Sequence, residues 1–182
     1  MRLPIRLNQL GRIMSRGCLI SLLSLLLCSS VNAEHSLSKE DKLKAAYLFN
    51  FTKFIEWPIL AKSERPSSIR ICVDGSSAFF EFLEELVANR RVGKLQKTVE
   101  VLSLETAGGC ELLFVREGEK KITIQLDHTV IVADSVGTAF PNGALFFYVE
   151  QGKLRFEIDL EKINSLNVIV SSELLKLARV RS

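Results

Sequence analysis

The sequence predicts an α/β fold: a three-layer sandwich around a mixed, mostly parallel sheet, with a C-terminal antiparallel hairpin and helices on both faces. Short apolar strands alternate with amphipathic helical segments through the first half of the chain. Near the C-terminus, two strand-like segments flank Gln151-Gly152. Strands that alternate with helices imply parallel crossover connections, whereas a two-residue turn joins antiparallel strands.

The first helix is predicted to begin after Ser38, which serves as N-cap because acidic residues follow it in the first turn. It ends near Glu56, since the residue before Pro58 is driven out of the α region. A helical wheel gives one core-facing stripe, made of Leu43, Tyr47, Leu48, Phe51, Phe54 and Ile55.

Phe49 lies outside this stripe, on the same side as Lys53. Two interpretations are open. Either another helix covers Phe49, so that the first helix is buried on two sides, or Phe49 is an exposed contact residue.

The remaining elements follow from apolar periodicity and turn residues. Strands are expected over 69–73, 97–104, 111–115, 129–133, 144–149 and 154–158, and helices over 78–89, over 161–165 behind Asp159, and from Ser171. A helix over 117–125 is weaker, because β-branched residues 122–124 disfavour it.

Residues 1–33 have the layout of a signal peptide. Four arginines and no acidic residue precede and flank an apolar run from Cys18 to Leu27, and Val31-Asn32-Ala33 provides a cleavage site after Ala33. A membrane span needs roughly 20 apolar residues, so the run is short for one, although an uncleaved anchor is the alternative. Cys28 follows the large Leu27, which argues against a lipid anchor.

Removal of this leader changes the charge of the chain. The sequence has 24 Lys and Arg against 21 Asp and Glu, and without the four leader arginines the balance becomes 20 against 21. A near-neutral mature chain gives no support for nucleic-acid binding or for an anionic membrane surface. Residues 34–182 are enough for one domain, which we expect in the periplasm with no membrane insertion after cleavage.

Two cysteines, Cys72 and Cys110, remain after cleavage. In an oxidising compartment an even pair suggests a disulfide. Two buried free thiols are the alternative.

The residue types needed for catalysis are sparse. Apart from His35 at the start of the mature chain, His128 is the one histidine of the domain, beside Asp127 and just before a predicted strand, and a nucleophilic triad with Ser135 has nothing to fix its geometry. One histidine and two distant cysteines do not form a recognisable zinc set. We therefore expect no enzymatic activity, no metal and no cofactor.

Both ends of the predicted domain carry motifs of a known family. The segment KAAYLFNFTKFIEWP at 44–58 resembles the opening motif of the YfiR-like periplasmic proteins, and GKLRFEIDL at 152–160 with SSELLKLARV at 171–180 resembles the closing block. The resemblance supports the Cys72–Cys110 disulfide. It departs at 145–147, where the best-described member has a second cysteine pair.

The resemblance implies a repressor that binds the periplasmic sensor domain of an inner-membrane diguanylate cyclase and lowers cyclic-di-GMP signalling. A sensor kinase is another partner that the family suggests, and a homodimer is plausible. Hypothetical partner-binding residues are Phe49, Lys53, Trp57, Arg155 and Glu157. The competing function is a small-molecule-binding module with its crevice near residues 74–77, at the carboxyl end of a strand.

Overall fold

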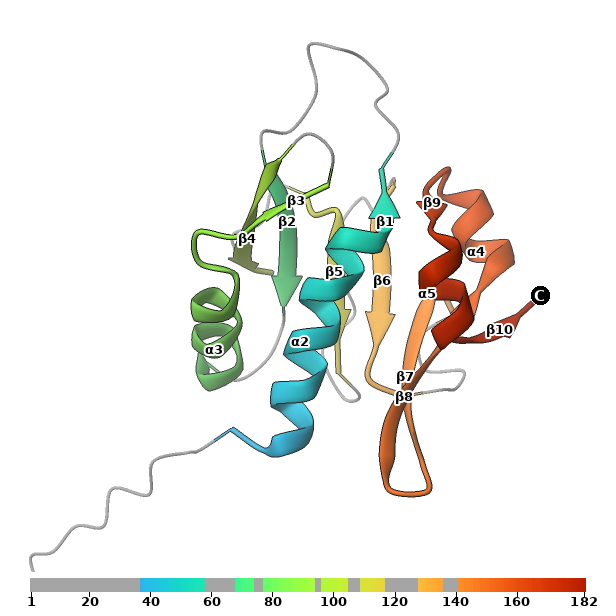
Figure 1. Cartoon of the computed structure of the whole chain (residues 1–182), viewed down its shortest axis with the longest axis horizontal. Coiled ribbons are helices and arrows are strands. Elements are labelled where there is room, and N and C mark those ends of the chain that lie inside the picture. Colours follow the sequence, from blue (N-terminus) through green and yellow to red (C-terminus); the bar gives the residue numbers. More distant parts are fainter. Residues whose placement is uncertain are drawn as a thin grey trace, which may run out of the picture. The chain divides into compact units, whose positions relative to one another are not determined.

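The computed structural model describes residues 37–57, 68–73, 77–93, 96–104, 109–116, 128–135 and 141–182. Their main feature is an eight-stranded sheet with the order β10-β8-β7-β6-β5-β2-β4-β3 (Figure 1). Its strands are β2 (Ser68–Val73), β3 (Arg91–Val92), β4 (Lys97–Ser103), β5 (Leu112–Val115), β6 (Val130–Ala133), β7 (Leu145–Glu150), β8 (Lys153–Asp159) and β10 (Arg179–Arg181). β1 (Ile55–Glu56) and β9 (Ile169–Val170) form a separate two-stranded sheet.

The sheet is mixed and mostly parallel, as predicted. β4, β2, β5, β6 and β7 pair in parallel, as do β8 and β10, whereas β7–β8 and β3–β4 are antiparallel. The β7–β8 hairpin turns at Gln151 and Gly152, whose φ angles of 51° and 71° lie in the left-handed region that this kind of turn requires.

Four helices are described: α2 (Lys39–Phe54), α3 (Ser77–Val87), α4 (Leu160–Ser165) and α5 (Ser172–Leu177). Side chains of Ser38, Asp159 and Ser171 cap α2, α4 and α5 by accepting the backbone N–H three residues on. The caps at Ser38 and Asp159 were predicted, and the last helix was expected to start at Ser171. α2 ends two residues earlier than expected, because Ile55 and Glu56 are extended and pair with β9.

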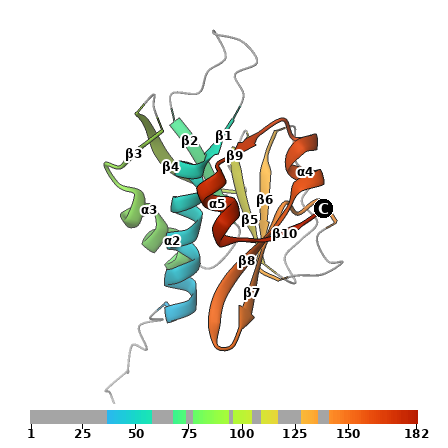
Figure 2. The same ribbon diagram turned by 45° about the vertical axis from the view of Figure 1, so that its right-hand side comes forward.

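The larger core joins the helices to one face of the sheet. α2, α3 and α5 lie on that face (Figures 1 and 2). At its centre, Tyr47 and Phe51 of α2 pack on Phe147 of β7 and Phe156 of β8, with the Phe51 and Phe156 rings 5.2 Å apart. These rings couple the first helix to the C-terminal hairpin.

The opposite face carries a smaller cluster of buried residues, made of Cys72, Cys110, Leu113, Val115, Ile131, Ala133 and Phe146. Each described helix has its buried apolar residues in the larger cluster instead. The predicted helix over 117–125 lies outside the described residues, so the α/β fold is confirmed while the helical layer expected on this second face stays a prediction.

The Cys72–Cys110 disulfide is confirmed. It joins β2 to the residue two positions before β5, with Cα atoms 5.9 Å apart. Both cysteines are buried, and Thr129 donates a hydrogen bond to the Cys110 carbonyl, which extends the connection to the start of β6.

One member of the predicted core stripe is wrong. Leu43 is 52% exposed, since it lies one turn before Tyr47, near the start of α2 and beyond the aromatic cluster. The last helix ends at Leu177 with Ala178 as its C-cap, because the chain turns there into β10 beside β8.

The disulfide gives the first testable prediction. The Cys72→Ala, Cys110→Ala double variant should lose about 3 to 4 kcal/mol of unfolding free energy, because its denatured chain is no longer closed into a loop of some 39 residues. Urea denaturation measures the loss, and reduced wild-type protein should fall to a similar midpoint. An unchanged midpoint in oxidising buffer would show that the bridge adds no stability.

Candidate interaction surface

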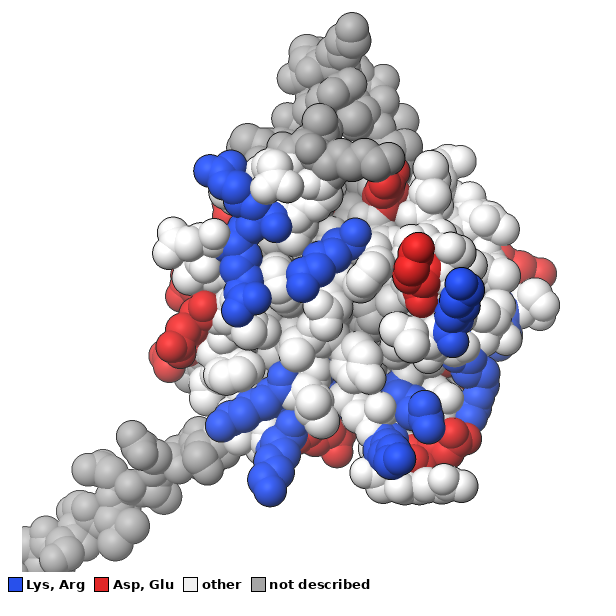
Figure 3. Space-filling view, in the orientation of Figure 1, with Lys and Arg blue, Asp and Glu red and all other residues white. Residues whose placement is uncertain are grey.

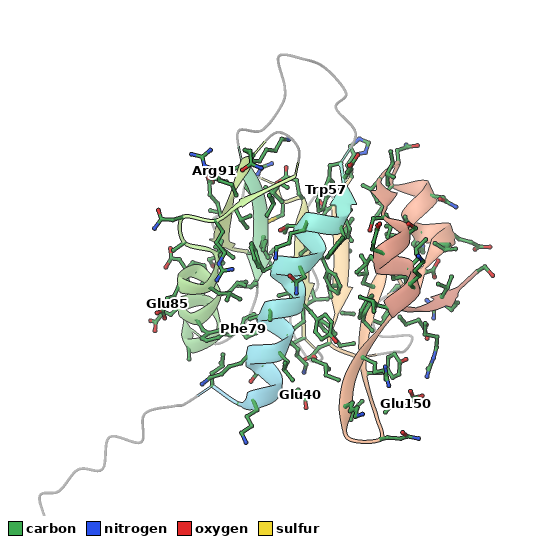
Figure 4. The ribbon with its side chains drawn as sticks, viewed as in Figure 1. Glu40, Trp57, Phe79, Glu85, Arg91 and Glu150 are labelled. Carbon is green, nitrogen blue, oxygen red and sulfur yellow. A yellow bond between two sulfur atoms is a disulfide. The ribbon has the colours of Figure 1, made fainter. Side chains whose placement is uncertain are left out.

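Trp57 is committed to an internal contact at the end of α2 (Figure 4). Its indole Nε1 donates to the carbonyl of Glu111, 3.0 Å away, just before β5. The Glu111 carboxylate in turn accepts from the backbone N–H and the guanidinium of Arg70 on β2. The half-buried Trp57 therefore links α2 to the sheet, with its polar atom already satisfied.

Phe49 is buried, with 5% of its surface exposed. The Lys53 ammonium lies 4.3 Å from its ring centroid and the Arg90 guanidinium 5.1 Å, and α3 packs beside this side of α2. The interpretation of a helix buried on two sides is confirmed, and that of an exposed aromatic contact is wrong. Lys53 itself remains exposed at the surface.

Arg155 and Glu157, the two predicted partner-binding residues on the hairpin, differ in their surroundings. Arg155 is exposed, with its Nε 3.5 Å from Glu150. Glu157 is buried and lies 3.3 Å from Arg181 of β10, which also donates to Asp159 at 2.8 Å. Glu157 and Asp159 thus share a side of the sheet, as the strand alternation indicated, and hold β10 against β8.

The Asp159 carboxylate is stabilised in its ionised form. Burial favours the neutral acid, but hydrogen bonds from the Lys162 backbone N–H and the Arg181 guanidinium outweigh it and hold the Asp159 pKa below its ordinary value. Ion pairing there serves the fold, since the same carboxylate caps α4.

A second polar cluster pins the start of α2 to the carboxyl ends of the parallel strands. The buried Lys44 ammonium lies 2.5 Å from Asp134, after β6, and 2.6 Å from Glu40. Burial lowers the Lys44 pKa, yet the two carboxylates more than offset this and raise it above its ordinary value. Asp41 pairs with Arg116, after β5, at 2.8 Å. These charges neutralise one another within the fold.

Of the candidate catalytic residues, Asp127 lies outside the described residues, whereas His128 and Ser135 lie within them. His128 Nδ1 lies 3.2 Å from the Leu166 carbonyl, a contact that positions its ring within the fold. Across the described ranges, no group of three or more His, Cys, Asp or Glu side chains could hold a metal ion. Residues 74–76 of the proposed crevice lie outside the described part.

One cavity among the described residues is a candidate for a ligand site, but it is small. It has a volume of about 150 Å³ and is lined by Thr129, Ile131, Asn142, Lys162, Ser165 and Leu166. Pockets for organic ligands usually measure about 300 to 1,000 Å³, so this cavity does not resemble one.

Exposed apolar side chains gather instead where α2 begins, beside the hairpin. We name Leu43, Val149, Leu154 and Leu177 the hairpin patch. Leu43, Val149 and Leu177 are 52%, 57% and 67% exposed, and Leu154 is half-buried. Tyr47 forms the base of the patch, because it packs on Phe147 and Phe156 and lies one turn after Leu43.

Strand register and the views of the fold place the other members. Val149 and Leu154 are cross-strand partners. Val149 follows Phe147 by two residues and Leu154 precedes Phe156 by two, so both lie on the face of the sheet that carries these core phenylalanines. Leu177 ends α5, which contacts α2, and both views show that end of α5 beside the hairpin (Figures 1 and 2). Figure 4 shows Glu40 and Glu150 at this same end of the domain, opposite Trp57.

The comparison with protein families decides the family. A model of YfiR/HmsC-like proteins matches residues 41–179. The chain belongs to the YfiR/HmsC-like family. This family comprises periplasmic regulators of diguanylate cyclase signalling and is regulatory rather than catalytic. A search of curated proteins finds no match. Among the described helices, none is long and apolar enough to cross a membrane.

For this YfiR/HmsC-like chain, the sequence-based choice of contact residues missed the hairpin patch. Val149 and Leu177 belonged to predicted elements. Periodicity does not show, however, which apolar residues lie beyond the reach of the neighbouring helices and strands and so remain exposed. A usable signal was Leu43, which extends the apolar stripe one turn beyond the aromatic residues of α2.

Lys44 provides a test of the polar cluster. Lys44→Ala should cost about 2 to 3 kcal/mol, because it leaves the half-buried Asp134 carboxylate without its cation, whereas Lys42→Ala on the exposed side should change stability by less than about 0.5 kcal/mol.

The contribution of Lys44 to the unfolding free energy should depend on pH. The folded-state pKa of Lys44 lies above the ordinary 10.5, so its stabilisation is complete below that pH and is lost as pH rises through the folded value. On the alkaline side of neutral pH, urea titrations of wild type and Lys44→Ala should therefore converge only in strongly alkaline buffer. A stability gap that closes between pH 5 and 8 would contradict the assignment.

Proposed function

We propose that this YfiR/HmsC-like protein binds the periplasmic sensor domain of an inner-membrane diguanylate cyclase and represses it, which lowers cyclic-di-GMP signalling. The hairpin patch is the observation that carries the proposal. Soluble domains rarely leave large apolar side chains together on the surface without a binding partner. Such a patch on a member of a regulatory family supports regulation by protein contact.

The way the patch is built also favours recognition of a protein. Its base is fixed by the aromatic packing between α2 and the hairpin, so little conformational entropy is lost when a partner docks. The surface is open, and it combines the start of α2 and the end of α5 with the β7–β8 strand pair. Small organic ligands instead prefer enclosed, concave sites.

Cellular cyclic-di-GMP provides the test. Deletion of the gene should raise the cyclic-di-GMP level, and wild-type protein should restore it. The Leu43→Ser, Val149→Ser double variant should fold but fail to restore it, because two apolar contacts worth about 1 to 3 kcal/mol each are lost.

Ile169→Ser is the matched control. Ile169 is 64% exposed but lies on β9, outside the patch, so its variant should restore repression fully. Full repression by the patch variant would show that the hairpin patch is not needed for repression. An unchanged cyclic-di-GMP level after deletion would remove the proposed function itself.

A further inference from the structure

Beyond the proposed function, we infer that the surface around Lys53 and Arg90, which we name the cation pair, binds an acidic segment of a partner protein. The two side chains flank a single aromatic ring. The Lys53 ammonium lies 4.3 Å and the Arg90 guanidinium 5.1 Å from the ring centroid of Phe49. The cation pair lies near the Trp57 end of α2, whereas Leu43 of the hairpin patch stands about 15 Å earlier along the helix axis.

Local structure holds both side chains against the ring. Lys53 follows Phe49 by about one turn of α2, and its ammonium donates to the side-chain oxygen of Asn50 at 3.0 Å. On the other side, α3 ends where Asn89 enters the left-handed region, with a φ angle of 59°, and the Arg90 N–H donates to the carbonyl of the last helical residue at 3.0 Å. The two charges are therefore positioned before a partner arrives, which lowers the entropy cost of binding.

The cation pair has no internal counter-ion among the described residues. Both side chains are exposed, and no carboxylate of the described ranges forms an ion pair with Lys53 or Arg90. Because both charges lie against one ring, they are closer together than the screening length of about 10 Å in 0.1 M salt. Their repulsion therefore persists in the free protein, and a carboxylate that reaches both side chains relieves it.

The surroundings of the cation pair favour a narrow acidic segment over a broad anionic surface. Two exposed acidic residues belong to this region, Glu56 on β1 and Glu85 on α3. Figure 4 shows Glu85 on the outer side of α3, pointing away from α2. Figure 3 shows basic side chains over the end of α2 and over β3 and β4, with acidic ones at the margin over α3. A membrane surface would bring anionic headgroups against these acids as well, whereas a short protein segment contacts the cation pair alone.

Carbodiimide crosslinking of the exported protein in isolated envelopes tests this inference. The reagent activates a carboxylate, which then forms an amide with a lysine amine in contact with it. Mass spectrometry should therefore show Lys53 joined to an Asp or Glu of another protein, in a peptide with an excess of acidic residues. Lys53→Arg keeps the charge but offers no amine, so the link should disappear in this variant while the fold is retained.

The charge at position 90 provides a second readout. Arg90→Glu should reduce the Lys53 link at least about tenfold, because it removes the positive charge of the cation pair, whereas Arg90→Lys keeps that charge and should retain the link. Lys153→Glu is the matched control. Lys153 is exposed on β8, on the opposite face of the sheet from α2, so its reversal should leave the link unchanged. Urea midpoints close to that of wild type establish that each variant is folded.

Four results would overturn the inference: no Lys53 link to another protein, a link to a peptide of this chain, a linked peptide without an excess of acidic residues, or a link that survives Arg90→Glu in the folded variant. Each of them leaves the proposed function standing, because the cyclic-di-GMP measurements test the hairpin patch. An acidic peptide from a cyclase or from another envelope protein supports the inference when the link also requires a cation at position 90.

Discussion

The packing of α2 against the hairpin is the interaction on which the rest of the structure depends. Tyr47 and Phe51 contact Phe147 and Phe156 with ring centroids 5.2 to 6.0 Å apart, and Phe114 and Phe79 continue the cluster to β5 and α3. Elements far apart in sequence are thereby fixed to one another. The base of the hairpin patch is the outer end of this cluster, so the fold and the proposed docking surface share the same contacts.

Charged residues act mainly as fasteners around this core. Lys44 and Arg116 hold the start of α2 to the strand ends, and Arg179 and Arg181 hold β10 to the hairpin. β10 is the edge of the eight-stranded sheet, and alternating arginines on an edge strand also oppose pairing with other chains.

The sequence predicted features that depend on local pattern. The caps at Ser38 and Asp159, the start of the last helix near Ser171 and the hairpin at Gln151-Gly152 each follow from a few adjacent residues, and so were found. The short strands β1, β3, β9 and β10 were missed, because their pairing is decided by partners distant in the chain or by tertiary packing. The exposure of Leu43 and the burial of Phe49 were equally beyond periodicity, since both depend on which neighbouring element extends far enough to cover them.

Hydrogen–deuterium exchange of the oxidised protein, with and without the periplasmic domain of the cyclase that we propose as its partner, tests the central claim most directly. The account predicts slower exchange over 39–47, 147–154 and 174–178, the segments that carry the hairpin patch and its base. Slower exchange confined to β3 and β4, or to the carboxyl ends of β5 and β6, would contradict it.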